Sequence, residues 1–220
     1  FGEGSLTDSG YPRVVKEWTR GTPLESARLV FEGEQTDVAS AAYTNHTPDG
    51  DYHMIVRTPE FYRGHYFMML GDHIVKLDIP IDAQPRGLFE NQFMLSLRSD
   101  WTVGGTTYPA DALLAIDLDR FLAGDRGFDV LFEPSARVSL AGTSTTRNLL
   151  LLATLDNVRS RLYEMRYEDG EWTGEEITLP GIGSVGLSAT SDEHDTYMIT
   201  YTDPLTPSSL YIKRPGEAPE

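Results

Sequence analysis

A strand-like segment that mixes aromatic and aliphatic residues recurs five times along this 220-residue chain. The five copies begin at positions 14, 65, 113, 162 and 210, so successive copies are 51, 48, 49 and 48 residues apart. A period of about 48 residues falls in the range of repeats that form the four-stranded blades of a β-propeller. The repeat therefore predicts an all-β fold built from consecutive, similar units.

The segments next to each copy repeat as well. A second strand precedes it at residues 54–57, 93–98, 149–154 and 197–201, and a more alternating strand follows it at 75–79 and 177–179. Alternation buries one face of a strand, as at the outside of a blade, whereas the continuous apolar runs 66–70 and 149–152 indicate burial on both faces. The remaining strand, at 38–42, 139–144 and 183–188, has small side chains, which suit the crowded axis of a propeller. Gly/Ser loops are the alternative for these three segments.

We therefore predict a β-propeller fragment, one partial propeller domain over residues 1–220. Three complete four-stranded blades are expected near residues 37–80, 83–134 and 138–180, between two partial blades near 11–32 and 183–214. Residues 1–11 are expected to be a loop from the middle of a longer protein. An incomplete propeller leaves strand edges uncovered, which makes a dimer through these edges an alternative to a monomer.

One stretch departs from the strand pattern. Leu114, Leu118, Phe121 and Leu122 have helical spacing. We predict a strand that ends at residue 117, followed by a single helical turn over 119–123 that Gly124 closes. A full helix over this stretch is the competing interpretation.

Charge and composition exclude several classes of partner. With 18 basic and 34 acidic residues, the formal charge is −16, which argues against a nucleic-acid partner because such proteins concentrate Lys and Arg. No apolar run approaches the length of about 20 residues that spans a bilayer, so no membrane partner is expected. Cysteine is absent, so disulfides and thiolate metal sites are excluded. The compartment stays open, cytoplasmic or periplasmic.

The chain carries no recognisable nucleophile of its own. The serine of an α/β-hydrolase lies in a Gly-x-Ser-x-Gly turn that exposes it beside oxyanion donors. Ser184 comes nearest to this pattern, but residue 182 is Ile. The five histidines accompany no such turn; they are His46, His53, His65, His73 and His194. A triad assembled from separate loops is the alternative, and we assign no catalytic residue.

A glycine pattern near residue 183 favours a structural role. The glycines at 181, 183 and 186 match a dinucleotide-binding pattern, which needs a strand before it and a helix after it. Pro180 precedes the pattern and residues 187–190 lack a helical period, so the segment favours an outer strand that turns into an inner one. We expect no cofactor.

The acidic and histidine pairs indicate no metal site. Asp72-His73 and His194-Asp195 each lack a further ligand at a standard spacing. The triplet 49–51 is too short for a calcium loop of the helix-loop-helix kind. Solvated turns are the expected role of all three, and we assign no metal ligand.

A protruding hairpin is expected around Trp101. Gly104 and Gly105 suit a two-residue turn whose positions need a positive φ. Such a turn pairs Val103 with Thr106 and sets Trp101 across from Tyr108, a contact of about 0.2–1 kcal/mol. The hairpin either stabilises the blade alone or forms part of a rim that touches a partner domain or substrate.

Four segments resemble the propeller domain of bacterial prolyl oligopeptidase family proteins. They are SGYPRVVKEWTRGTPL at 9–24, LRSDWTVGG at 97–105 with TYP at 107–109, LLAI at 113–116 with FLAG at 121–124, and TD at 202–203 with LTPSSLY at 205–211. The resemblance covers nearly the whole chain in the right order. It implies a propeller that covers a Ser/Asp/His triad in an α/β-hydrolase domain of the same parent chain, and that admits only short, proline-containing peptides.

The resemblance leads to one main interpretation and two rivals. The chain is expected to be the non-catalytic, gating propeller of a serine endopeptidase, with the hydrolase domain absent from this sequence. A stand-alone propeller that acts as a binding or scaffold module is the alternative. A propeller glycosidase would need two carboxylates beside the scissile bond, but the inner segments 38–44, 139–146 and 183–190 contain no Asp or Glu.

Overall fold

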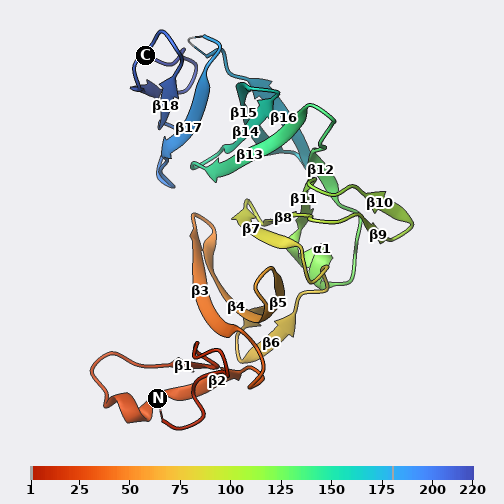
Figure 1. The fold of residues 1–220 in the computed structure, drawn as a ribbon, viewed down its shortest axis with the longest axis vertical. Coiled ribbons are helices and arrows are strands. Elements are labelled where there is room, and N and C mark those ends of the chain that lie inside the picture. Colours follow the sequence, from red (N-terminus) through yellow and green to blue (C-terminus); the bar gives the residue numbers. More distant parts are fainter. Residues whose placement is uncertain (1, 180) are drawn as a thin grey trace. The chain divides into compact units, whose positions relative to one another are not determined.

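The computed structural model describes residues 2–179 and 181–220, and these residues fold almost entirely into strands (Figure 1). The strands form separate antiparallel sheets: three of four strands, one of three, one of two, and a two-stranded hairpin. This arrangement confirms the predicted all-β fold of three complete and two partial blades. No described helix is long and apolar enough to cross a bilayer.

The chain divides into two compact units. The first comprises Phe1–His46 and Gly50–Gln84, and the second Thr47–Asp49 and Pro85–Glu220. In the first unit, β1 (Val14–Glu17) pairs with β2 (Arg28–Glu32), with the 3-10 helix η1 (Leu24–Ser26) between them. The four-stranded sheet that follows contains β3 (Ala39–Thr47), β4 (Gly50–Glu60), β5 (Arg63–Leu70) and β6 (His73–Lys76).

The second unit contains the remaining sheets. The first has β7 (Gln84–Phe89), β8 (Gln92–Ser96), β11 (Leu113–Asp117) and β12 (Asp129–Phe132). The next has β13 (Val138–Thr145), β14 (Leu150–Asp156), β15 (Arg159–Glu168) and β16 (Glu171–Glu176). The last has β17 (Ser184–Ala189), β18 (Tyr197–Thr202) and β19 (Ser209–Lys213). The hairpin β9 (Trp101–Val103) and β10 (Thr106–Tyr108) is inserted between β8 and β11.

The recurring segments occupy one structural position. They lie in β1, β5, β11, β15 and β19, and β5, β11 and β15 each pair with a strand on both sides. The segments rich in small residues are strands β3, β13 and β17 at the first edge of their sheets, so the loop alternative for them is wrong. The repeat in the sequence is therefore a repeat of sheets.

The predicted outer strand at 177–179 is wrong. The fourth strand of that sheet is β16 at Glu171–Glu176, and residues 177–179 follow its end. Asp169 and Gly170 both have positive φ, 53° and 84°, and make a tight turn that fixes the pairing of Glu168 with Glu171. An Asp-Gly turn of this kind is the standard link between two hairpin strands, and it begins the fourth strand directly after the third.

The predicted helical turn is confirmed, and a full helix is not formed. Strand β11 ends at Asp117, whose side chain caps the short helix α1 (Leu118–Leu122) by accepting a hydrogen bond from the Arg120 amide. Gly124, with φ of 99°, follows the helix. The expectations for residues 1 and 180 lie outside the described residues.

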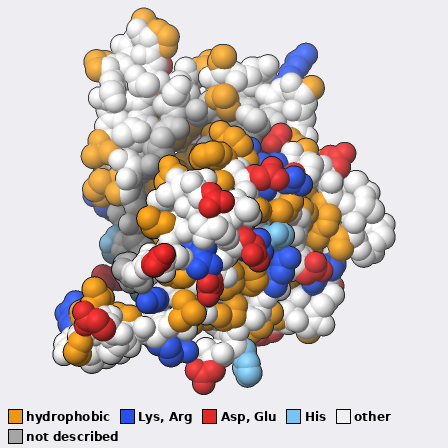
Figure 2. Space-filling view, turned by 60° about the horizontal axis from the view of Figure 1, so that its bottom comes forward, with side chains coloured by type: hydrophobic (Ala, Val, Ile, Leu, Met, Phe, Trp, Pro, Cys, Tyr) orange, Lys and Arg blue, Asp and Glu red, His pale blue; other side chains and the backbone are white. Residues whose placement is uncertain are grey.

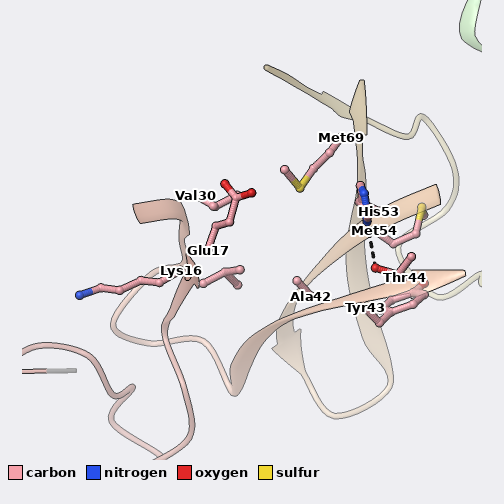
Figure 3. Close-up of a pocket in the computed structure, with 10 residues that line it drawn as sticks. Lys16, Glu17, Val30, Ala42, Tyr43, Thr44, His53, Met54 and Met69 are labelled. Atoms are coloured by element: carbon pink, nitrogen blue, oxygen red, sulfur yellow. Dashed lines mark hydrogen bonds between the residues drawn. The ribbon is translucent and has the colours of Figure 1, made fainter. Parts of the chain in front are cut away.

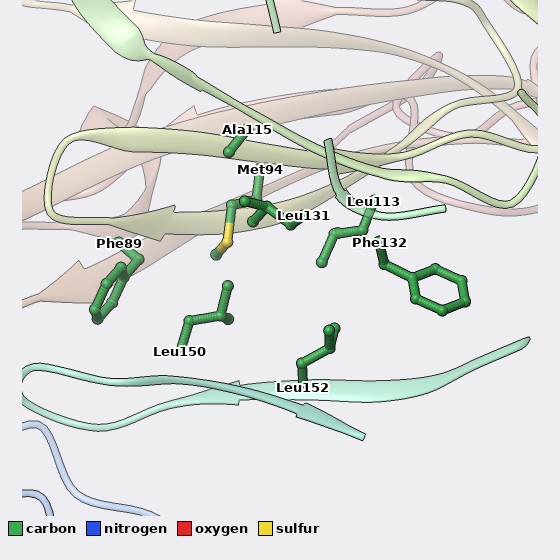
Figure 4. Close-up of a cluster of buried hydrophobic side chains, with 8 residues drawn as sticks. All are labelled: Phe89, Met94, Leu113, Ala115, Leu131, Phe132, Leu150 and Leu152. Carbon is green, nitrogen blue, oxygen red and sulfur yellow. The ribbon is translucent and has the colours of Figure 1, made fainter. Parts of the chain in front are cut away.

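Strand β14 supplies the core on both of its faces, as its continuous apolar run predicts, whereas in the run 66–70 Met68 is buried but Leu70 is 40% exposed. Leu150 and Leu152 pack with Phe89, Met94 and four further residues of the β7–β12 sheet, which Figure 4 shows facing them. On the opposite face, Leu149, Leu151 and Ala153 pack with Leu162, Ile177, Tyr197 and Ile199. Successive side chains of a strand point to opposite faces, so this one strand joins three consecutive sheets.

Leu151 tests this packing, because it is fully buried between two sheets. We expect Leu151→Ala to lower the free energy of unfolding by about 2–5 kcal/mol, through lost apolar burial and the cavity that remains. Leu155 lies on the same strand but is 36% exposed, so Leu155→Ala serves as the control with a much smaller loss. Urea denaturation measures both, and equal losses would contradict the assignment.

Candidate functional site

The hairpin β9–β10 has the predicted register. Trp101 lies opposite Tyr108, and Val103 lies opposite Thr106. Gly104 and Gly105 form the turn with φ of 59° and 82°. Both values lie in the left-handed region, where glycine has no steric penalty, so the glycine pair explains why the chain reverses at this point.

An aromatic cluster holds the base of this hairpin. The Phe128 ring lies 5.2 Å from that of Trp101 and 5.6 Å from that of Tyr108, measured between ring centroids. The buried Tyr108 hydroxyl accepts a hydrogen bond of 3.0 Å from the Phe128 amide. The Arg126 guanidinium lies 4.5 Å from the centre of the Phe121 ring. The base of the hairpin is therefore firmly packed, while its tip at residues 104–107 is exposed.

Gly105→Ala isolates the backbone contribution to the hairpin, because a Cβ there would meet no atom within 4 Å. We expect faster amide hydrogen exchange in β9 and β10, since a non-glycine residue in the left-handed region costs about 1–2 kcal/mol. Gly142 also has open space around a Cβ but no positive φ, so Gly142→Ala is the matched control. Unchanged exchange in the Gly105 variant would refute the role of the turn.

The glycine pattern at 181–186 serves close packing and not dinucleotide binding. The segment leads into strand β17 and not into a helix. A Cβ on Gly181 would lie 2.6 Å from the Tyr201 hydroxyl, and a Cβ on Gly183 would lie 2.5 Å from the Thr202 carbonyl oxygen. The Thr202 oxygen belongs to the backbone, so Gly183 has no room for a side chain, and Gly181 lies against the end of the Tyr201 side chain.

The histidines are spread over separate environments. His46 pairs with Asp51 at 2.7 Å, and both side chains are exposed. His53 Nδ1 lies 2.9 Å from the Thr44 hydroxyl. Burial, together with the positive charges of Lys76 and Arg57, lowers the pKa of His65. His73 and His194 are exposed, and among residues 2–179 and 181–220 no group of three or more His, Asp or Glu side chains could hold a metal ion.

Asp195 links two consecutive sheets, a role that its pairing with His194 in the sequence did not indicate. Its carboxylate accepts hydrogen bonds from the Thr146 hydroxyl at 2.8 Å and from the Asn148 amide and side chain at 2.7 and 2.9 Å. Burial alone would raise the pKa of this carboxyl, but the bonds from Asn148 and Thr146 outweigh burial and lower it. The ionised form is therefore the one that the fold stabilises.

This lowered pKa gives a pH dependence of defined sign. A carboxyl whose pKa is lower in the folded than in the unfolded state stabilises the fold above about pH 4 and loses that effect as the pH falls. We expect Asp195→Asn to lower the unfolding free energy at pH 7 by about 1–3 kcal/mol. The deficit should shrink towards pH 3, as followed by urea denaturation. Asp192→Asn, in the same turn but exposed, is the control, and a deficit independent of pH would contradict this account.

A buried ion pair joins the same two sheets. Lys213 Nζ lies 3.1 Å from Glu164 Oε1, with side-chain exposures of 6% and 11%. The Tyr197 hydroxyl donates to the same oxygen at 2.9 Å. Burial raises the pKa of Tyr197, and the negative charge of Glu164 raises it further, so the hydroxyl remains a donor. Removal of one member would leave the others buried without their partner, which makes this group structural.

Figure 3 shows a recess within the first unit, lined by β1 and β2 on one side and by β3, β4 and β5 on the other. It measures about 280 Å³, and its lining includes Val15, Val30, Met54 and Met69 together with Glu17 and His53. The described sheet beside it contains β1 and β2 alone, whereas the other third strands, β5, β11 and β15, pair on both sides. The recess therefore lies between two sheets and has a mixed apolar and polar lining.

One face of the surface carries charges of both signs. In the face that Figure 2 shows, Asp and Glu side chains lie next to Lys and Arg side chains. Among the ion pairs of the second unit, Arg161 lies 3.0 Å from both Asp156 and Glu176. Despite the net charge of −16, this face does not present one continuous acidic patch.

Comparison with known proteins matches the chain to one family model. Residues 3–214 match the model described as the prolyl oligopeptidase N-terminal β-propeller domain. An uncharacterized peptidase of Sinorhizobium fredii is 32% identical, over 94% of this chain and 30% of that protein. An uncharacterized peptidase of Rickettsia prowazekii is 26% identical over the same shares. The chain thus spans less than a third of the length of these relatives.

Solved structures show the same fold. A post-proline cleaving enzyme from Rickettsia typhi matches all of this chain and 33% of its own, with a TM-score of 0.91 and 24% identity. Oligopeptidase B from Trypanosoma brucei matches 94% of this chain and 30% of its own, with a TM-score of 0.69 and 12% identity. At these identities the structural likeness establishes the fold alone.

Proposed function

This chain belongs to the prolyl oligopeptidase N-terminal β-propeller domain family, and from that premise we propose that it is the non-catalytic propeller of a serine-type prolyl oligopeptidase. Its parent would cleave short, proline-containing peptides with a triad in an α/β-hydrolase domain outside this sequence. The match over residues 3–214 is the observation that carries the proposal.

The residues of the chain support a division of labour. The sequence contains no Gly-x-Ser-x-Gly turn, so a nucleophile of the hydrolase type would have to come from elsewhere in the parent. Two carboxylates with several partners, Asp195 and Glu164, are engaged in joining sheets. The catalytic residues would therefore lie in the hydrolase domain, and this chain would restrict which substrates reach them.

We propose that the propeller restricts access to the active site by steric gating. Apolar interfaces on both faces of β14 resist separation of the sheets, because opening them would expose buried leucines to water. A propeller whose sheets stay together would admit a short peptide but not a folded protein. Short peptides and the hydrolase domain are the partners that this proposal requires, whereas the dimer through uncovered strand edges is not required by it.

We expect the isolated chain to show no hydrolysis of a prolyl reporter peptide, whereas the complete parent hydrolyses it. With the parent, we expect kcat/KM for a long, proline-containing protein substrate to be lower by about tenfold or more, equivalent to about 1.4 kcal/mol of transition-state stabilisation. Steady-state kinetics with matched prolyl sites measure both.

The rival functions give different results. A stand-alone binding or scaffold propeller predicts that the longest protein containing this chain hydrolyses no prolyl peptide. Hydrolysis by the isolated chain, retained after removal of contaminating peptidases, would sink the non-catalytic assignment. Equal cleavage of short and long substrates by the parent would leave the peptidase assignment intact but remove gating.

A further inference from the structure

The turn between β15 and β16 consists of Asp169 and Gly170. Both residues are exposed, and both have positive φ, 53° and 84°. The turn sets Glu168 opposite Glu171 and so fixes the register of the outer strand β16. Within residues 2–179 and 181–220, no hydrogen bond or ion pair holds the Asp169 carboxylate. This side chain is therefore free to react with the backbone beside it.

An aspartate followed by glycine places two reactive groups next to each other. The Gly170 amide nitrogen reaches the Asp169 Cγ atom by closing a five-membered ring. Glycine has no Cβ to hinder this approach, and apart from its chain neighbours no atom lies within 4 Å of the Cβ position of Gly170. In the other Asp-Gly pair of the chain, Asp49-Gly50, the glycine is the first residue of β4. Gly170 instead lies in a turn, outside both strands.

The strand that follows the turn is held on one side only. In the described sheet β16 pairs with β15 alone, and five of its six residues are exposed. Trp172 is the exception, since its ring lies 5.1 Å from that of Tyr167 and 5.9 Å from that of Phe89. Segments with few buried contacts open locally at a low free-energy cost. Asp169 therefore has access to the backbone conformation that ring closure requires.

We propose that Asp169 is a site of spontaneous isoaspartate formation, which releases β16 from its sheet. The Gly170 nitrogen attacks Cγ of the protonated Asp169 side chain. A C–N bond forms, the Cγ–OH bond breaks, and the hydroxyl leaves as water with the amide proton. Water then adds to the main-chain carbonyl carbon of the resulting succinimide and breaks its bond to nitrogen. The water released in the first step is consumed in the second, so no cofactor, oxidant or enzyme is required.

The product alters the backbone within the turn itself. The main chain then passes through Cβ and Cγ of Asp169 and is one atom longer before it reaches Gly170. A two-residue hairpin turn depends on a defined backbone conformation at both of its residues. The lengthened turn no longer holds Glu168 opposite Glu171, and Trp172 loses its contacts with Tyr167 and Phe89.

Asp111 provides a comparison within the same chain. It is also exposed and in the left-handed region, with φ of 62°, but Ala112 follows it. After incubation of the full-length parent at pH 7 for several weeks, we expect the isoaspartate fraction at Asp169 to exceed that at Asp111 about tenfold, because the Ala112 side chain hinders attack. Peptide mass spectrometry with electron-based fragmentation distinguishes the two linkages and measures both sites.

Two variants separate the modification from other effects of ageing. Asp169→Glu keeps the negative charge but has to close a larger ring, which forms much more slowly. Gly170→Asn adds a Cβ, and asparagine tolerates the left-handed region. We expect amide hydrogen exchange in β16 to become about tenfold faster in the aged parent and to stay unchanged in both aged variants. Exchange in β13, at the other edge of the same sheet, should not change in any of them.

Three results would overturn the proposal in whole or in part. Equal isoaspartate fractions at Asp169 and Asp111 would remove the modification site. Isoaspartate at Asp169 with unchanged exchange in β16 would remove the release of the strand. Equally accelerated exchange in aged Asp169→Glu would also remove it, because that variant forms little isoaspartate. None of these measurements requires peptidase activity, so they are independent of the proposed function.

Discussion

Burial of both faces of a sheet is the constraint on which the second unit depends. A sheet whose two faces are both apolar is stable only if it lies between two others, and β14 meets this condition residue by residue. Leu150 and Leu152 face one neighbouring sheet, while Leu151 and Ala153 face the other. A strand of this kind cannot end the row, which is why the chain repeats its blade instead of closing a two-sheet sandwich.

Apolar packing alone would not fix the registration of neighbouring sheets, because leucines tolerate sliding. Directional contacts add what packing lacks. Asp195 accepts three hydrogen bonds from residues of the preceding sheet, and Glu164 binds Lys213 and Tyr197 from the following one. In the first unit, buried Asp37 binds Arg57 at 2.8 Å and so ties the segment before β3 to β4 of the same sheet. Such contacts are unfavourable when incomplete, so they select one arrangement over close alternatives.

The repeated strands and the tight glycine turn could be predicted from the sequence, whereas contacts between distant residues could not. The third strands share a spacing near 48 residues, and Gly104-Gly105 specifies its own turn, so both were correctly predicted. The outer strand at 171–176 was missed because its exposed residues lack a regular alternation, although Asp169-Gly170 could have located it. The bonds of Asp195 cross 47 to 49 residues and follow no local pattern, so only the fold reveals them.

The β15–β16 turn and the β14–β15 turn differ in the residues they contain. The β15–β16 turn, Asp169-Gly170, consists of residues that favour tight, solvent-exposed turns. The β14–β15 turn is just as tight, yet it pairs Asn157 at positive φ with a β-branched Val158 that is 85% exposed. Backbone geometry does not require an apolar residue there, and solvation disfavours one. The residues of this turn therefore do not follow from its backbone geometry alone.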